Sequence, residues 1–202
     1  MLIRKEHGHR MKRMCMRFRF AKTIVRFVPK RILQMSFDWI LTYAPLTIIR
    51  RIPFSYGVYL KCLSSTNNQV ILDWGAHIGN CAILFSRLAG ANGKVICIEP
   101  FIQSYEILVK KLIQYRLDNV IAINKGLWRK STKMKLHEYR NSLSCSLINN
   151  QNINISNQLD IDCITVDDLI RNLNLSRLDS IKMDIDGSEI QALQGARWTL
   201  SH

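Results

Sequence analysis

Short apolar runs alternate with segments of helical periodicity from about residue 68 to the end of the chain. Runs rich in β-branched residues are expected to form strands, and they lie at 70–72, 94–98, 119–124 and 181–185. Between the first three runs, apolar residues recur every three or four positions, which predicts helices. Strands and helices that alternate at this length predict a mostly parallel sheet with right-handed crossovers. We therefore expect an α/β fold with a doubly wound, mostly parallel sheet.

An insertion interrupts this alternation between residues 126 and 163. Two segments of alternating polar and apolar residues, 133–139 and 159–164, flank a polar loop rich in Ser and Asn at 141–157. Alternation of this kind is typical of strands with one exposed face. We interpret the region as an inserted hairpin or a pair of edge strands.

Two polar residues mark the starts of helices after the insertion. Thr165 stands just before Asp167 and Asp168, so it is expected to cap a short helix. Ser188 stands three residues before Gln191, which is the spacing of a capping box that would open the last helix.

The first 60 residues differ in composition from the rest of the chain. The formal net charge is +14, and residues 1–31 carry eleven Lys and Arg against one Glu. Residues 32–49 are mostly apolar, but Pro45 and several polar residues interrupt them, so a membrane span is not expected. We expect residues 1–60 to form a basic, helical extension and residues 61–202 to form the main domain. The basic segment is typical of attachment to an anionic membrane surface, of nucleic-acid binding or of a solvated tail.

The six cysteines are scattered along the chain without a C-x-x-C pair. Metal-ligand spacing is absent, so no metal site is expected. Cys81 and Cys97 fall in segments that read as buried, where a thiol packs as a small apolar group. These features favour reduced cysteines and a cytoplasmic protein, with membrane association through the basic segment as the alternative.

Three of the expected strands end in acidic residues, namely Asp73, Glu99 and Asp184. In an open parallel sheet, ligands bind at the carboxyl ends of the strands. Gly75 and Gly79 bracket the turn after the first strand and permit close approach of a ligand to the backbone. Glu99 closes the second strand, where a carboxylate can accept hydrogen bonds from both hydroxyls of a ribose. Together these residues predict a site for a nucleoside-bearing cofactor.

The turn itself narrows the choice of cofactor. A dinucleotide fold needs G-x-G-x-x-G, but Trp74 and Ala76 occupy two of the three glycine positions when the last glycine is aligned on Gly79. A Walker P-loop is also missing. The remaining pattern suits a cofactor without phosphates, whose ammonium group a nearby carboxylate can balance. S-adenosylmethionine fits that description.

Three segments within residues 68–200 together resemble the FkbM-type methyltransferases. They read VILDWGAHIGN at 70–80, VICIEP at 95–100 and IKMDIDGSEI at 181–190, the last followed by LQGA at 193–196. The resemblance implies a Rossmann-like fold of the class I methyltransferases and S-adenosylmethionine as the methyl donor. It also implies a small-molecule or glycan acceptor, such as a hydroxyl of a sugar, lipid or secondary metabolite.

The resemblance also assigns roles to individual positions. The residues that it implies for cofactor binding are Asp73, Gly75, Ala76, Gly79, Glu99 and Asn124. The residues that it implies near the reacting methyl group and the acceptor are Asp184, Asp186 and Glu189. A carboxylate there can orient the acceptor hydroxyl and take its proton.

Two features depart from the family pattern. Asp186 stands where the family generally has Glu. The family also continues past the fourth strand and its helix into three further strands, whereas this sequence stops at residue 202. We therefore expect a domain that is incomplete at its C-terminus, with its fourth strand as an unpaired edge.

Three functions stay open on the sequence. The first is O-methylation of a hydroxyl with S-adenosylmethionine. The second is a truncated, catalytically inactive remnant of such an enzyme. The third is ribose methylation of RNA; the absence of an Asn-Pro-Pro-Tyr-like motif argues against methylation of a base. For residues 1–31, an anionic membrane surface is favoured over nucleic acid as the partner.

Overall fold

The computed structural model of the protein describes residues 41–43, 68–139, 145–148 and 155–202. The chain divides into two compact units, residues 1–64 and 65–202. In the first unit only residues 41–43 are described, and they are helical. The expected basic extension therefore lies almost wholly outside the described residues, and its helical character stays a prediction.

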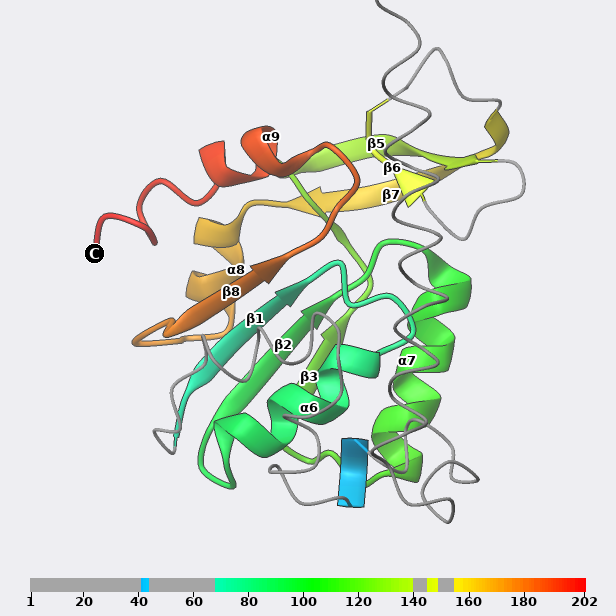
Figure 1. Ribbon diagram of the computed structural model, residues 1–202. Coiled ribbons are helices and arrows are strands. Elements are labelled where there is room, and N and C mark those ends of the chain that lie inside the picture. Colours follow the sequence, from blue (N-terminus) through cyan, green and yellow to red (C-terminus); the bar gives the residue numbers. More distant parts are fainter. Residues whose placement is uncertain (1–40, 44–67, 140–144, 149–154) are drawn as a thin grey trace, which may run out of the picture. The chain divides into compact units, whose positions relative to one another are not determined.

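A four-stranded parallel sheet forms the centre of the second unit (Figure 1). Its strands are β1 (Val70–Trp74), β2 (Lys94–Ile98), β3 (Val120–Ile123) and β8 (Ser180–Met183), in the order β3-β2-β1-β8. All three strand pairs are parallel. This sheet confirms the predicted α/β class and the four predicted core strands. Within the described residues β8 pairs with β1 alone, so it is an edge strand as expected.

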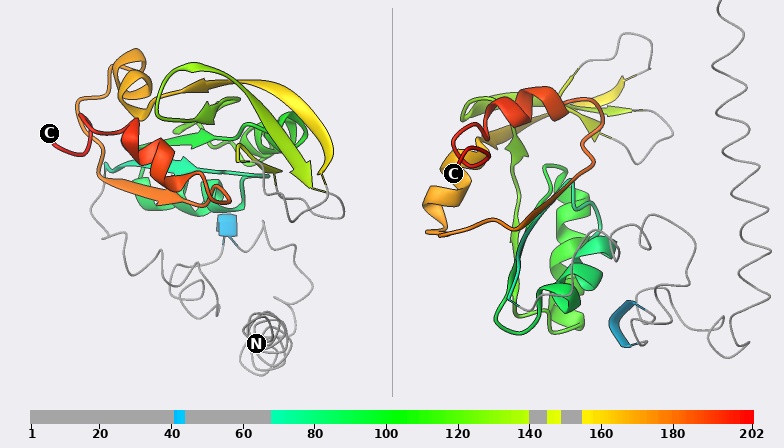
Figure 2. Two further views of the ribbon diagram at one scale, coloured as in Figure 1. Left: turned by 90° about the horizontal axis from the view of Figure 1, so that it is seen from above. Right: turned by 60° about the vertical axis from the view of Figure 1, so that its left-hand side comes forward.

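Helices cover both faces of the parallel sheet (Figure 2). The helices α6 (Asn80–Ala89) and α7 (Ile102–Gln114) lie on one face. On the other face, the β1 side chains of Val70, Leu72 and Trp74 pack in one buried cluster with residues of α8 (Val166–Asn172) and α9 (Glu189–Gln194). Since side chains alternate along a strand, Ile71 and Asp73 point to the face that α6 covers.

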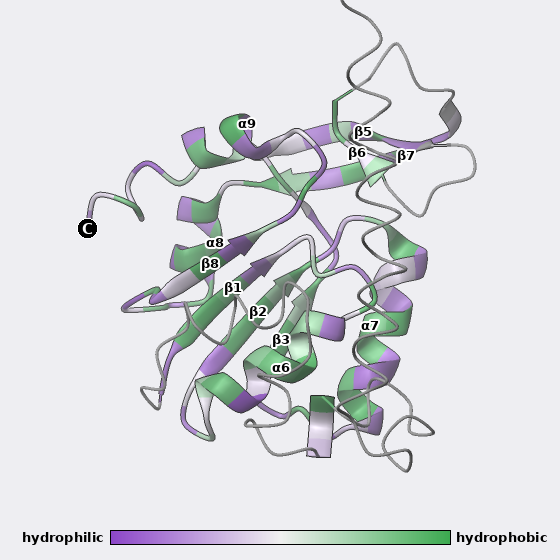
Figure 3. Cartoon of the chain, viewed as in Figure 1, coloured by the Kyte–Doolittle hydropathy of each residue, from purple (hydrophilic) through white to green (hydrophobic). Residues whose placement is uncertain are grey.

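The hydropathy of the elements matches these positions. In Figure 3, β1 and β2 are hydrophobic along most of their length, whereas α7 carries bands of both kinds. Strands of a parallel sheet that are covered on both faces are expected to be continuously apolar, and a surface helix is expected to be amphipathic. The pattern that predicted the elements thus reflects their burial.

The insertion forms a second four-stranded sheet. Its strands are β4 (Gly126–Leu127), β5 (Thr132–Tyr139), β6 (Cys145–Ser146) and β7 (Ile155–Ile164), in the order β4-β7-β5-β6. β5 pairs antiparallel with β7 and β6, while β4 pairs parallel with β7. The predicted strand pair is confirmed, although β7 begins four residues before the expected 159.

The two predicted caps have different outcomes. Thr165 caps α8, because its hydroxyl oxygen accepts a hydrogen bond from the Asp168 backbone N–H at 2.9 Å. Ser188 is the N-cap of α9, but its hydroxyl makes no cap hydrogen bond and donates to the Ile185 carbonyl at 3.0 Å. The predicted capping box is therefore wrong. Asp186 and Gly187 just before it adopt positive φ, and that tight turn brings the Ile185 carbonyl within reach of Ser188.

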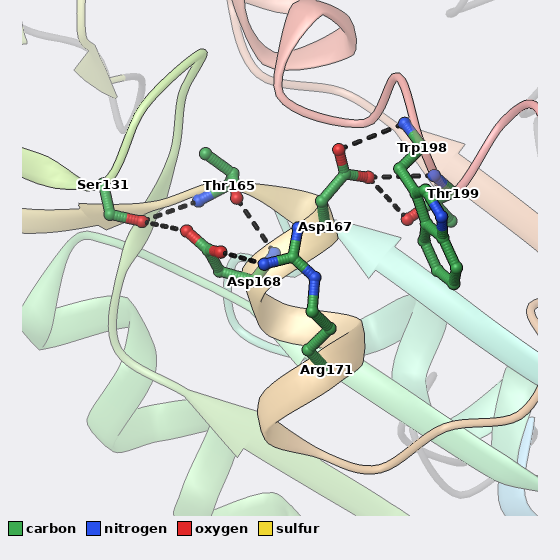
Figure 4. A network of polar contacts seen from close by, with 7 residues as sticks. All are labelled: Ser131, Thr165, Asp167, Asp168, Arg171, Trp198 and Thr199. Carbon is green, nitrogen blue, oxygen red and sulfur yellow. Dashed lines mark hydrogen bonds and ion pairs between the residues drawn. The ribbon is translucent and has the colours of Figure 1, made fainter.

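A network of polar contacts ties the end of the described chain to the start of α8 (Figure 4). The Asp167 carboxylate accepts hydrogen bonds from the Thr199 backbone N–H, the Thr199 hydroxyl and the Trp198 backbone N–H at 2.9, 2.7 and 3.1 Å. Partial burial opposes ionisation of Asp167, but these donors outweigh it and lower its pKa. Asp167 therefore fixes the segment that follows α9.

We expect Asp167→Ala to lower the free energy of unfolding by about 1–3 kcal/mol, because three donors lose their acceptor. The pKa of Asp167 in the folded protein lies below its ordinary value. The stability difference between wild type and Asp167→Ala is therefore fully present at pH values above the ordinary pKa of aspartate, and it is lost as the pH falls through the lowered pKa. Urea titrations at neutral and acidic pH measure both effects, with the exposed Asp118→Ala as the control. Equal stability of the two variants at neutral pH would contradict the prediction.

Candidate functional site

A cavity of about 300 Å³ lies at the carboxyl ends of β1, β2 and β8. Residues of the second sheet close it from the other side, among them Leu136 of β5 and Cys145 of β6. Parallel strands bring their carboxyl ends to one edge, which is where open α/β sheets bind ligands. The cavity is therefore at the place that the strand-end residues predict.

Glu99 is held rigidly at this cavity, directly after β2. Its two carboxylate oxygens accept hydrogen bonds from the backbone N–H groups of His77 and Phe101, at 2.7 and 2.9 Å. The residue is only 6% exposed. Burial raises its pKa, and the two N–H donors offset this only in part. Since an ionised carboxylate oxygen has two lone pairs, each oxygen keeps one acceptor position for a ligand.

Gly75 forms the turn between β1 and α6 and also lines the cavity. Its φ is +75°, a conformation that residues with a Cβ adopt only at a cost. A Cβ at this position would lie 2.1 Å from the Asp184 carbonyl oxygen. Both the conformation and the close approach of β8 therefore require glycine here.

Gly79 serves a different contact from Gly75. It is the N-cap of α6 with φ +81°, and a Cβ there would lie 2.5 Å from Cδ1 of Leu108 on α7. It is absent from the cavity lining. The described contacts therefore place Gly79 in the packing of α6 against α7.

Asp73 lies beneath the turn and is completely buried. The Nζ atom of Lys182 is 3.0 Å from its Oδ1, and the same Nζ donates a hydrogen bond to the Gly75 carbonyl oxygen at 2.7 Å. Burial raises the pKa of Asp73 to about 6, although Lys182 acts in the opposite direction. Asp73 is absent from the cavity lining. The ion pair with Lys182 is the contact that the structure gives its carboxylate.

The three acidic residues near the last strand separate into two groups. Asp184 and Asp186 line the cavity and are exposed. Glu189 is absent from the lining, and its Oε1 accepts a hydrogen bond from the Gly187 backbone N–H at 3.1 Å. The structure thus brings Asp184 and Asp186 together with Glu99, whereas Glu189, the first residue of α9, binds the turn before that helix.

Ala76 and Asn124 also lie outside the cavity lining. Ala76 is buried, and its backbone N–H donates to the Ile98 carbonyl at 3.0 Å. The Asn124 side-chain amide donates to the carbonyls of Glu99 and Pro100 at 2.8 and 3.0 Å. Asn124 therefore fixes the loop that carries Glu99, and it lines a second cavity of about 320 Å³.

Several cavity residues were missed by sequence reasoning. Trp74 and His77, which the sequence analysis did not assign to the site, both line the cavity. The indole N–H of Trp74 is buried and has no hydrogen-bond partner among the described residues. Cys145 and Leu147 come from the polar loop region, where no periodicity marks them. The glycine turn was the signal that could have found Trp74 and His77.

The described ranges contain neither a cluster suited to a metal ion nor a helix suited to crossing a membrane. No group of three or more His, Cys, Asp and Glu side chains there is arranged to hold a metal ion. No helix in the same ranges is long and apolar enough to cross a membrane.

Comparisons with known proteins relate the chain to methyltransferases. The family model described as "Methyltransferase FkbM domain" matches residues 73–202. A protein-L-isoaspartate O-methyltransferase of Thermosipho melanesiensis is 30% identical over 101 residues, which cover 48% of this chain and 49% of that protein. The chain thus spans about half the length of this curated relative.

Solved methyltransferase structures are also similar to the chain. A methyltransferase FkbM from Methylobacillus flagellatus matches with 22% identity and a TM-score of 0.47, over 67% of this chain and 31% of the other. An S-adenosylmethionine-dependent methyltransferase from Aquifex aeolicus matches with 22% identity and a TM-score of 0.34, over 52% of this chain and 50% of the other. Since the family model alone covers well over half of the 202 residues, the chain belongs to the FkbM methyltransferase family.

Proposed function

We propose that the protein is an S-adenosylmethionine-dependent methyltransferase that acts on a hydroxyl oxygen of a small molecule or glycan. The observation that carries this proposal is the Glu99 carboxylate, which two backbone N–H groups fix at the cavity with an acceptor position left on each oxygen. A ribose offers two adjacent hydroxyl donors, which such a carboxylate can bind together.

The other residues at the cavity fit the same cofactor. The Gly75 turn leaves no room for a side chain, so a ligand can approach its backbone closely. We assign Glu99 to the ribose hydroxyls and the backbone around Gly75 to the amino-acid portion of the cofactor. When bound, S-adenosylmethionine supplies a methyl group that is electrophilic because it is attached to a positively charged sulfur.

We assign Asp184 and Asp186 to the acceptor. Both carboxylates line the cavity close to the turn, and both are exposed to an entering molecule. A carboxylate in this position orients the acceptor hydroxyl and takes its proton as the oxygen is methylated. Glu189, the first residue of α9, is assigned to holding the turn before this helix, because its carboxylate accepts a hydrogen bond from the Gly187 N–H.

Transfer of a labelled methyl group to a pool of hydroxylated sugars and lipids tests this assignment. We expect Asp186→Asn to lower the rate of transfer by about a hundredfold, the lower range for a positioned acid or base, with the dissociation constant of S-adenosylmethionine unchanged. Glu189→Gln is the matched control and is expected to lower the rate much less. Tight binding of the cofactor by the wild-type chain without transfer to any acceptor would favour the inactive remnant instead.

For residues 1–31 we propose attachment of a cytoplasmic enzyme to an anionic membrane surface, from the sequence alone. These residues combine eleven Lys and Arg with interleaved apolar side chains. Sedimentation with vesicles of phosphatidylglycerol and of phosphatidylcholine tests this proposal. Binding to the anionic vesicles that is lost when residues 1–31 are deleted supports it, and equal binding to both vesicle types contradicts it.

A further inference from the structure

A buried ion pair joins β8 to the turn that follows β1. The Asp73 side chain is 0% exposed and the Lys182 side chain is 9% exposed. The Lys182 Nζ lies 3.0 Å from Asp73 Oδ1 and donates to the Gly75 carbonyl oxygen at 2.7 Å. One ammonium group thus contacts residues on both sides of Trp74, the last residue of β1.

The strand register explains how this pair forms. In the parallel pairing of β1 with β8, Asp73 lies opposite Lys182, so both side chains point to the same face of the sheet. On the other side of β1, Asp73 lies opposite Cys97 of β2. Burial raises the pKa of the Cys97 thiol, so that neighbour is neutral. Lys182 is therefore the group that balances the charge of Asp73.

The contacts continue from this pair to Glu99. Beyond the Gly75 carbonyl, the backbone N–H groups of Gly75 and Ala76 donate to the Ile98 carbonyl at 3.1 and 3.0 Å. The next N–H, that of His77, donates to Glu99 Oε2 at 2.7 Å. The orientation of the turn thus decides where these N–H groups point, and the last of them fixes the Glu99 carboxylate.

We propose that Asp73 and Lys182 are positioning residues, which hold the Gly75 carbonyl against β8 and thereby keep the turn in the orientation that fixes Glu99. In this arrangement Asp73 acts through Lys182 and does not contact the cofactor. The expected effect on the affinity for the methyl donor rests on the proposed function. The expected effect on the order of the turn does not.

Removing only one charge of this buried pair is expected to destabilise the fold, so the test uses a variant that lacks both charges. Removing one member of a buried pair leaves the other charge uncompensated, which strongly destabilises a fold, whereas removing both is often tolerated. Lys182→Met alone is therefore expected to fold poorly. The double variant Asp73→Asn with Lys182→Met removes both charges and also the hydrogen bond to Gly75, so it separates positioning from folding.

Two measurements on the full chain test the inference. Calorimetry with S-adenosylhomocysteine is expected to show a dissociation constant about tenfold or more above wild type for the double variant, because a misplaced site residue weakens binding. Amide hydrogen exchange without any ligand is expected to be faster over residues 75–79, while the urea midpoint stays near that of the wild type. Lys111→Met, which removes a contact between Lys111 Nζ and Asn80 Oδ1, is the control and should leave the affinity unchanged.

The outcomes separate the two proposals. Wild-type affinity and wild-type exchange in the double variant would overturn the positioning role. If the wild-type chain binds no S-adenosylhomocysteine, the proposed function fails, and faster exchange over 75–79 still supports the positioning role while unchanged exchange overturns it. If this double variant does not fold, Asp73→Leu with Lys182→Met replaces both charges by apolar side chains of similar volume, and it is measured in the same two ways.

Discussion

Replacing Glu99 by alanine is expected to weaken binding of S-adenosylhomocysteine by about a hundredfold or more. The substitution removes an ionised acceptor, and each hydrogen bond to a charged group contributes about 1.5–3 kcal/mol. Because about 1.4 kcal/mol corresponds to a tenfold change in the dissociation constant, the loss of two such bonds amounts to about a hundredfold or more. It also leaves the His77 and Phe101 N–H groups without the acceptor that holds them in place. Calorimetry on the purified variant measures the loss.

Glu99→Gln adds a sharper comparison, because it preserves shape. A glutamine amide has one NH₂ group, and that group must face a backbone N–H donor in place of an acceptor oxygen. We therefore expect Glu99→Gln to lose most of the affinity as well. The exposed Glu106→Gln on α7 is the control. Affinity in Glu99→Gln equal to that of the control would refute the assignment of Glu99 to the ribose.

The affinity should also depend on pH through Glu99. Burial raises the pKa of this carboxyl, so it takes up a proton at a higher pH than an ordinary glutamate. The protonated carboxyl offers fewer acceptor positions. The affinity for S-adenosylhomocysteine is therefore expected to fall as the pH drops through the raised pKa of Glu99. The contribution of Glu99 is the part of the pH profile that Glu99→Gln lacks.

Local sequence pattern predicted the elements that hold the site but not all of its contacts. The runs that became β1 and β2 are apolar because helices cover both faces of the sheet, so burial left a readable signal. The Ser188 cap failed because positive φ at Asp186 and Gly187 redirects the chain. Spacing alone does not report that turn.

Long-range contacts account for the rest of what sequence reasoning did not predict. Asp73 and Lys182 are 109 residues apart, and only the parallel register places them opposite one another. The contributions of Leu136 and Cys145 to the cavity depend on how the second sheet lies over the strand ends. No local propensity encodes that placement, so the acceptor side of the site was less predictable than the glycine turn.

Gly75→Ala is expected to abolish measurable binding of S-adenosylhomocysteine, a larger loss than that expected for Glu99→Ala. The new methyl group would lie 2.1 Å from the Asp184 backbone carbonyl oxygen, a contact that only a shift of the turn or of β8 can relieve. The positive φ of +75° adds about 1–2 kcal/mol for a residue with a Cβ. A shift of the turn moves the His77 N–H away from Glu99, and a shift of β8 displaces Asp184 at the cavity, so either one weakens both the site and the fold.

Gly187→Ala separates backbone strain from the steric clash. Gly187 also has a positive φ, +98°, but a Cβ there would meet nothing within 4 Å. The Gly187→Ala variant should therefore lose about 1–3 kcal/mol of its free energy of unfolding from backbone strain alone. Its affinity for S-adenosylhomocysteine should stay near that of the wild type. Urea titration and calorimetry on both variants give the comparison. If Gly75→Ala bound S-adenosylhomocysteine as well as Gly187→Ala, the cofactor would have to lie away from the Gly75 turn, because the added methyl group displaces either the turn or the Asp184 segment beside it.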